Sequence, residues 1–173
     1  MGLTGVYRTF LAGLPFVTDQ RGYLLATSSM AAFVHGPLQG SYSAYKAGLW
    51  ALCDEWRLEL RHTGVGVGSL HPTFFKTPMM DEVVEGGGSK AWGGNDQGAF
   101  GMAPIETIVE DTIRGIEARS RHIFAPRRMR LAALAPMLTQ RLAEAVGFKA
   151  ADVQEAVEAT RDNALAGASG TRD

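Results

Sequence analysis

Short apolar runs alternate with stretches of helical period along the first 126 residues, and this alternation constrains the fold more than any other feature. Three of the runs are predicted to be buried strands: residues 22–29, 65–70 and 122–126. Three stretches are predicted to be helices: residues 3–14, residues 41–62 and the stretch that starts at Pro104. We expect the first helix to stop before Pro15, which discourages continuation. Strands that alternate with helices predict a parallel α/β sheet.

The composition is that of an ordinary globular chain, and it narrows the possible partners. Of the 173 residues, 46% are apolar and 20% are charged, so one core can form without wholesale disorder. The net charge of -1 gives no reason to expect nucleic-acid binding. No apolar run reaches 18 residues, and the apolar N-terminal stretch lacks the positive start of a signal peptide. The lone Cys53 excludes an internal disulfide and fits the cytoplasm, which is the expected location.

Polar residues gather where the predicted strands end. Residues 27–29 (Thr-Ser-Ser) close the first strand, residues 71–79 follow the second, and Tyr42 and Lys46 lie near the start of a helix. In open parallel sheets, ligands bind outside the carboxyl ends of the strands. Residues four apart share a helix face, so Tyr42 and Lys46 can meet. An ammonium group lowers the pKa of a neighbouring phenol from about 10 toward neutral, so the pair predicts an acid/base site.

The spacing of the motif residues points to a family. Ser29 lies thirteen residues before Tyr42, and a Pro-x-x-x-x-Thr segment from Pro72 to Thr77 follows the next strand. Together with Lys46, this ordered set resembles the short-chain dehydrogenase/reductase family over roughly residues 2–126. The resemblance implies an α/β fold, namely a partial Rossmann-like, doubly wound parallel sheet with a helical C-terminal tail.

The resemblance also implies a role for each motif residue. Tyr42 would exchange a proton with the alcohol or carbonyl oxygen of a small substrate, and Ser29 would hold the same oxygen. Lys46 would assist Tyr42 and bind the nicotinamide ribose of NAD or NADP. The residues expected on the cofactor are Tyr42, Lys46, Pro72, Thr73, Phe75 and Thr77. The residues expected on the substrate are Ser29, Phe74, Met79 and Met80.

The sequence also departs from the family pattern. The strand, Gly-rich turn and helix that hold the rest of the dinucleotide do not occur, and Gly2 stands where the family has an asparagine. We therefore expect the C-terminal catalytic part of a longer protein, without the N-terminal nucleotide-binding βαβ units. Two alternatives stay open: an inactive truncated fragment, and a module that dimerises through helices 3–14 and 41–62. A ketoreductase of 3-oxoacyl thioesters is an alternative identity, and the choice between NAD and NADP is open. A homo-oligomer built through those two helices is expected for the enzyme as well.

Two regions are predicted along the chain. Residues 1–126 form the catalytic half of the Rossmann-like domain, and residues 127–173 form a helical extension that frays at its end. The extension begins basic and carries a regular leucine spacing: Leu131, Leu134, Leu138 and Leu142. Packing on its own domain or on a partner subunit is favoured over contact with a membrane surface.

Residues 73–103 are predicted to be a long loop with at most a short helix, which Thr77 would cap. Its apolar side chains either line a site for an apolar substrate or only pack the loop, and both readings stay open. Tyr45 is expected on the core stripe of its helix and outside the chemistry. The four histidines have no metal-ligand spacing and are expected to be solvated or locally bonded: His35, His62, His71 and His122. No metal is expected.

Overall fold

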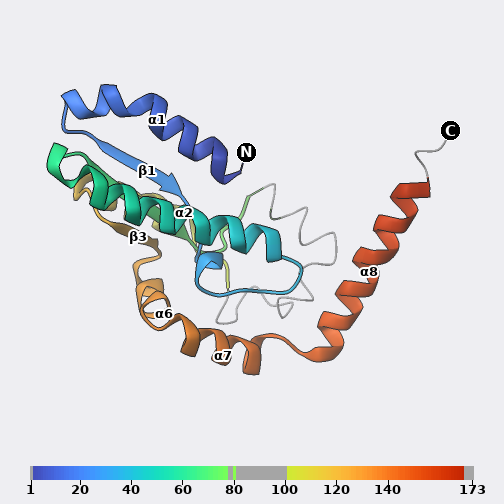
Figure 1. Ribbon diagram of the computed structural model, residues 1–173. Coiled ribbons are helices and arrows are strands. Elements are labelled where there is room, and N and C mark those ends of the chain that lie inside the picture. The colour runs from blue at the N-terminus through green and yellow to red at the C-terminus, as the bar shows by residue number, and fades with distance from the viewer. Residues whose placement is uncertain (1, 78–79, 81–100, 170–173) are drawn as a thin grey trace.

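The computed structural model describes residues 2–77, 80 and 101–169 (Figure 1). Helices and strands alternate as far as the third strand, and further helices follow it. The main elements are α1 (Leu3–Asp19), β1 (Tyr23–Thr27), α2 (Gly40–Glu59), β2 (Gly66–Pro72), α5 (Ile105–Glu117), β3 (His122–Ala125), α6 (Arg130–Leu134), α7 (Pro136–Gly147) and α8 (Ala150–Ser169). Short 3-10 turns lie between them: η1 (Met30–Ala32), η2 (Leu60–Thr63) and η3 (Arg127–Met129).

The strands form a parallel sheet in the order β1-β2-β3, and β2 is the middle strand of the described sheet. Successive side chains of a strand point to opposite faces. On one face, Leu24 of β1 shares a core cluster with Phe10 of α1 and Trp56 of α2. On the other face, Ile123 of β3 shares a cluster with Ile108 of α5. Helices therefore cover both faces, and the predicted doubly wound α/β architecture is confirmed.

Helix α1 is longer than predicted. The prediction that Pro15 ends it is wrong, because the helix continues to Asp19. A proline inside a helix removes a backbone hydrogen bond and costs about 3 kcal/mol. Phe10 is buried before the proline, and Val17 packs on the same cluster after it. Burial on both sides of Pro15 offsets the missing bond and keeps the helix continuous.

Helix α2 carries the predicted core stripe. Leu49, Cys53 and Trp56 are buried on its inner side. The helix ends in η2, and Gly64 follows with a φ of 79°, a left-handed conformation that glycine adopts without a side-chain clash. The packed stripe holds α2 along the sheet (Figure 1) and thereby fixes where its first turns lie.

The C-terminal helices pack on the domain through a side of α7 other than the leucine stripe. Ala143 shares a buried cluster with Met30 and Phe33. The side-chain oxygen of Gln140 accepts from the backbone N–H of His35 at 2.7 Å, and its nitrogen donates to the His35 carbonyl at 3.1 Å. The predicted stripe is exposed: Leu131, Leu134, Leu138 and Leu142. Helix α8 leads away from the sheet (Figure 1), and the division at residue 126 stays a prediction. Within the described ranges, no helix combines the length and the hydropathy needed to cross a bilayer.

Candidate active site

A cavity of about 700 Å³ lies at the carboxyl ends of β1 and β2. The start of α2, residues 72–77 and the α6–α7 segment bound it. Parallel strands end at the same edge of a sheet, so segments far apart in the sequence meet there. The cavity is lined by every described residue that the sequence assigns to the site: Ser29, Tyr42, Lys46, Pro72, Thr73, Phe74, Phe75, Thr77 and Met80. Met79 lies outside the described residues.

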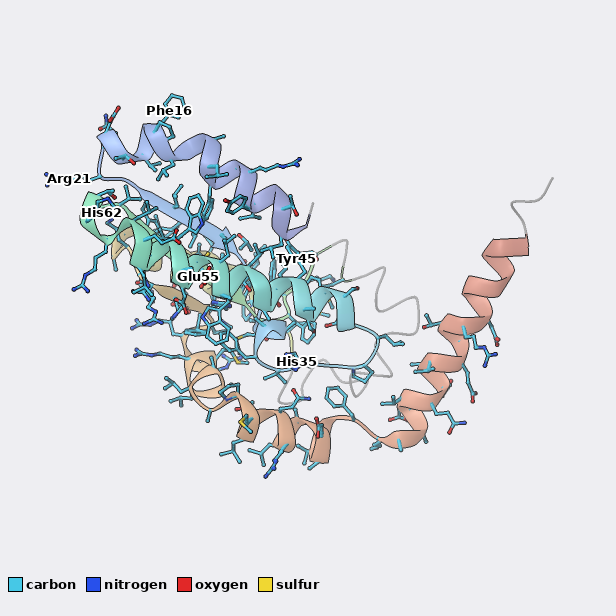
Figure 2. All side chains as sticks on the ribbon, viewed as in Figure 1. Phe16, Arg21, His35, Tyr45, Glu55 and His62 are labelled. Carbon is cyan, nitrogen blue, oxygen red and sulfur yellow. The ribbon has the colours of Figure 1, made fainter. Side chains whose placement is uncertain are left out.

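Lys46 is held at the end of β1 beside two tyrosine rings. Its Nζ donates a hydrogen bond to the carbonyl oxygen of Thr27 at 2.8 Å. The same atom lies 5.5 Å from the centre of the Tyr42 ring and 5.0 Å from that of Tyr45, both within cation–π range. Burial lowers the pKa of Lys46, because desolvation disfavours the ammonium form. Both phenols project from α2, where Figure 2 labels Tyr45, and of the two it is Tyr42 that lines the cavity.

Ser28 and Ser29 have different environments. Ser28 is buried, and its hydroxyl donates to the carbonyl oxygen of Lys46 at 2.7 Å, which ties β1 to α2. The hydroxyl oxygen of Ser29 accepts from the backbone N–H of Ala31 at 3.1 Å and so caps the turn η1. The hydroxyl hydrogen of Ser29 is therefore left to donate toward the cavity.

The segment after β2 is anchored by backbone hydrogen bonds. The N–H of Thr73 donates to the carbonyl of Ala125 at 2.9 Å, and that of Ala103 donates to the carbonyl of Phe74 at 2.8 Å. Phe75 packs on the cluster under α5 and also lines the cavity. Phe75 therefore does both things expected of the apolar loop residues: it packs the loop onto the core, and it lines the cavity.

Thr77 makes the side-chain contact expected of a cap. Its hydroxyl oxygen accepts from the N–H of Met80 at 3.2 Å, three residues along the chain. Residues 78 and 79 lie outside the described ranges, so the short helix predicted there stays a prediction.

One wall of the cavity comes from the C-terminal extension, which the sequence analysis left outside the site. The lining residues there are Met129, Ala132, Thr139, Leu142, Ala143 and Val146. Leu142 and Val146 are exposed as well, so they lie at the mouth of the cavity. The alternation of apolar and polar residues in this segment predicts a helix but does not say which side of that helix faces the candidate site.

His71 was expected to be solvated or locally bonded, and the structure places it in the core. Its side chain is 0% exposed, its Nε2 lies 2.8 Å from the hydroxyl of Ser69, and its Nδ1 lies 3.3 Å from the carbonyl oxygen of Ser29. Burial lowers the pKa of His71 to about 4, so its ring is neutral at neutral pH. The signal in the sequence was the alternation within β2, which places Ser69 and His71 on the same face as Val67.

The described residues give no sign of a metal centre. Within them, no group of three or more His, Cys, Asp or Glu side chains is arranged to hold an ion.

Comparison with known proteins places this arrangement in a family. A family model described as short chain dehydrogenase matches residues 1–87, half of the chain. The chain belongs to the short-chain dehydrogenase family. It is 36% identical over 83 residues to an uncharacterized NAD-dependent oxidoreductase of Mycobacterium tuberculosis, across 47% of this chain and 30% of that protein. It is 40% identical over 82 residues to a (-)-trans-carveol dehydrogenase of Rhodococcus erythropolis, across 46% of this chain and 30% of that protein.

A solved short-chain dehydrogenase of Mycobacterium paratuberculosis bound to NAD superposes with a TM-score of 0.58 at 25% identity. The match covers 72% of this chain and 52% of that one. The chain thus spans about half the length of this structure and 30% of the length of the two relatives above. The family match over residues 1–87 includes β1, β2 and α2, the helix that carries the Tyr-x-x-x-Lys motif.

Proposed function

We propose that the cavity is the active site of an NAD(P)-dependent oxidoreductase that transfers a hydride between a nicotinamide and an alcohol or ketone. The observation that carries the proposal is the meeting of Ser29, Tyr42 and Lys46 at one cavity, on the edge of the sheet where ligands bind. Their order and spacing match the family motif, and the NAD-dependent relative named above supports the cofactor class.

Tyr42 is the proton donor and acceptor in this proposal. In the reducing direction its phenol gives a proton to the carbonyl oxygen of the substrate, and in the oxidising direction its phenolate removes the proton of the alcohol. Lys46 assists because its ammonium group lies beside the Tyr42 ring and stabilises the phenolate. The bond from Lys46 to Thr27 keeps that positive charge in place.

Ser29 binds the same substrate oxygen. Its Oγ accepts from Ala31, which fixes the oxygen and leaves the hydroxyl hydrogen to point at the substrate. A donor that is already oriented costs no rearrangement when negative charge grows on the substrate oxygen, and such a donor is typically worth about 2 to 4 kcal/mol.

The residues present fit the nicotinamide end of the cofactor. An ammonium has three N–H groups, and Lys46 uses one on Thr27, so the others remain for the ribose hydroxyls. Pro72, Thr73 and Thr77 line the same cavity and would contact the nicotinamide side. When bound, the nicotinamide supplies or accepts the hydride. We assign these cavity residues to the nicotinamide end of the cofactor.

The lining favours a substrate with an apolar body. Away from Ser29 and Tyr42 the wall is made largely of aliphatic and thioether side chains: Met30, Val34, Leu38, Met80, Met129, Leu142 and Val146. Apolar pockets with few polar groups recognise apolar ligands and orient them through those few groups. The carveol dehydrogenase among the relatives is named for an alcohol of this kind.

Titration calorimetry with NADH and NADPH tests the cofactor half of the proposal. We expect binding to the full chain, weaker binding in Lys46→Ala and a smaller loss of binding in Tyr42→Phe. The Lys46 change removes the charged ribose donor, whereas the Tyr42 change removes one neutral hydroxyl on the cofactor side together with the proton donor. A folded chain that binds neither cofactor would contradict the proposal and favour the inactive-fragment alternative. Reduction of cyclohexanone and menthone, followed by the loss of NADPH absorbance, tests the chemistry.

One observation favours a second function, pairing through α1. Leu3, Tyr7 and Leu11 are spaced four residues apart and are all exposed, and Phe16 projects from the same helix (Figure 2). Exposed apolar stripes of this kind typically bury against a partner. We propose a homodimer through α1 and α2 as the form in which this surface is covered. Light scattering of the wild-type chain and of Leu11→Glu tests it, since a charge at this exposed position would separate a pair and would not change the mass of a monomer.

A further inference from the structure

A chain of hydrogen bonds runs under α2 from the active site to the surface. The carbonyl oxygen of Ser29 lies 3.3 Å from Nδ1 of His71, and Nε2 of His71 lies 2.8 Å from the hydroxyl of Ser69. The same hydroxyl lies 3.1 Å from Nδ1 of His122, whose Nε2 lies 3.6 Å from the Asp54 carboxylate. Ser69 and His71 are both 0% exposed. The proposed reaction uses none of the last four side chains.

The donors and acceptors along this series of hydrogen bonds can be assigned in only one way. A carbonyl oxygen only accepts, so Nδ1 of His71 must carry the hydrogen that bonds to Ser29. The neutral ring then has a lone pair on Nε2, and the hydroxyl of Ser69 must donate to it. That leaves the oxygen of Ser69 to accept from Nδ1–H of His122. One acceptor at the active-site end therefore fixes the tautomers of two histidines.

Ser29 is restrained where this chain ends. Its carbonyl oxygen accepts from His71 and from the N–H of Ala32 at 3.1 Å, and its hydroxyl oxygen accepts from Ala31 at 3.1 Å. The turn alone would fix the carbonyl only relative to the η1 backbone. The ring of His71 comes from the middle strand and packs against the rings of Phe33, at 4.9 Å, and Phe124, at 5.3 Å. The ring therefore ties Ser29 to the rigid sheet.

We propose that His71 is a positioning residue: its Nδ1–H holds the backbone carbonyl of Ser29 and, through it, the orientation of the Ser29 hydroxyl in the cavity. The role of that hydroxyl rests on the proposed function. His71 itself touches neither substrate nor cofactor in this arrangement. Ser69 and His122 lie one step further back: the Ser69 hydroxyl donates to Nε2 of His71, and Nδ1–H of His122 donates to Ser69.

The charged groups around the rings of His71 and His122 affect the pKa of each ring. The charged groups that face them are Lys46, Asp54, Arg57 and Arg121. Burial is the main cause of the low pKa of His71, and Lys46 and His122 lower it further, while Ser29 and Asp54 raise it. Burial also lowers the pKa of His122, against the attraction of Asp54 and with the repulsion of the two arginines. A proton on Nε2 of His122 leaves the chain intact, whereas a proton on Nε2 of His71 removes the acceptor for Ser69.

Nitrogen NMR of the full chain, labelled with ¹⁵N-histidine, tests the direction of the chain without any activity. We expect His71 to be neutral at pH 7 with its hydrogen on Nδ1, and His122 to keep the hydrogen on Nδ1 as it titrates. A hydrogen on Nε2 of His71, or a charged His71 at pH 7, would overturn the proposal. In Ser69→Ala the ring loses its donor at Nε2 but keeps the Ser29 carbonyl as acceptor at Nδ1, so we expect His71 to keep its hydrogen on Nδ1. A move of the hydrogen to Nε2 in this variant would show that the Ser29 carbonyl does not set the tautomer, and would overturn the proposal.

The amide hydrogen of Ala31 reports the orientation of Ser29, because it bonds to the Ser29 hydroxyl oxygen. We expect its exchange rate to rise roughly ten-fold in His71→Leu, which has no donor, and to stay near the wild-type value in His71→Asn. The asparagine amide can reach the Ser29 carbonyl from nearly the position of Nδ1. Equal exchange in the wild type and both variants would overturn the proposal, and so would equal acceleration in both. If His71→Leu does not fold, the Asn and Ser69→Ala variants still decide.

Kinetics with NADPH and menthone separate positioning from general stability. We expect His71→Leu to lower kcat roughly ten-fold with little change in KM, and His71→Asn to recover most of the loss. In a Ser29→Ala background, the same His71→Leu change should have almost no further effect, because the group it positions is gone. Independent, additive losses would overturn the positioning role. A chain that never transfers hydride would count against the proposed function, while the tautomer and the Ala31 exchange would still decide the case of His71.

Discussion

The ammonium group of Lys46 and the carbonyl oxygen of Thr27 are hydrogen bonded at 2.8 Å, which ties α2 to the end of β1. Ser28 completes the tie, because its hydroxyl donates to the backbone carbonyl of Lys46 at 2.7 Å. Lys46 is thus held at its backbone and at its tip. Since the cation is fixed from both sides, a tyrosine beside it can be changed without moving the charge.

Tyr42 and Tyr45 form a matched pair for testing the proton donor. Both rings lie within 5.5 Å of the Lys46 ammonium, but only Tyr42 of the two lines the cavity. We expect Tyr42→Phe to lower kcat for menthone reduction by about 10² to 10⁴-fold, because the phenol is the proposed proton donor. Tyr45→Phe should stay within a few fold of the wild type. Equal losses in the two variants would contradict the assignment of the acid to Tyr42.

The burial of His71 predicts a loss of stability in acid. Its pKa falls from 6.5 to about 4 on folding, so between these values the unfolded chain binds the proton and the folded chain does not. The contribution of the neutral ring is complete above about pH 6.5 and is lost as the pH falls toward about 4. The shift corresponds to at most about 3 kcal/mol.

Urea unfolding at pH 7 and at about pH 4.5 measures this loss. We expect His71→Gln to be less stable than the wild type at pH 7 but to depend less steeply on pH, since glutamine does not titrate. His35→Gln is the control, because His35 is exposed and the pH dependence should then match the wild type. A His71 variant with the full wild-type pH dependence would show that another group causes it.

The close packing around Gly68 in the middle strand predicts that a larger side chain there destabilises the fold. A Cβ at this position would overlap the hydroxyl of Tyr23 and the carbonyl oxygen of Ser120, which are hydrogen bonded to each other at 2.7 Å. We expect Gly68→Ala to lower the free energy of unfolding by about 1 to 3 kcal/mol. Gly13→Ala is the control, because a Cβ on Gly13 meets nothing within 4 Å and alanine favours the helix by up to about 1 kcal/mol. A stability of Gly68→Ala close to that of the wild type would mean that a shift of β1 relieves the overlap.

The position of Val146 predicts that a larger side chain there discriminates between substrates by their size. Its side chain is 79% exposed and lines the mouth of the cavity, so a larger side chain there narrows the entrance without disturbing the core. We expect Val146→Trp to raise KM for menthone by roughly ten-fold and KM for cyclohexanone much less. Ala145→Trp is the control, because Ala145 is exposed on the same helix and is not part of the lining. A common effect on both ketones would place the substrate entrance elsewhere.

Local patterns in the sequence predicted much of the architecture. The apolar run before Thr27 and the stripe of Leu49, Cys53 and Trp56 appear in the structure as a strand and a buried helix face. The first helix was predicted to end before Pro15, but the burial of residues on both sides of the proline outweighs the cost of the lost hydrogen bond. Competition between a local cost and a tertiary gain of similar size cannot be resolved from the residues near the proline alone.

The chemical groups of the candidate site could be identified from residue spacing. Ser29, Tyr42 and Lys46 could be found because helix period and strand ends are local geometry, and local geometry follows from residue spacing. The surroundings of these three residues follow from the packing of distant segments. The link from Ser29 to His71, and the wall that Val146 completes, join residues separated by tens of positions along the chain. Such contacts depend on how strands and helices pack in three dimensions, and the spacing of residues in one dimension does not contain that information.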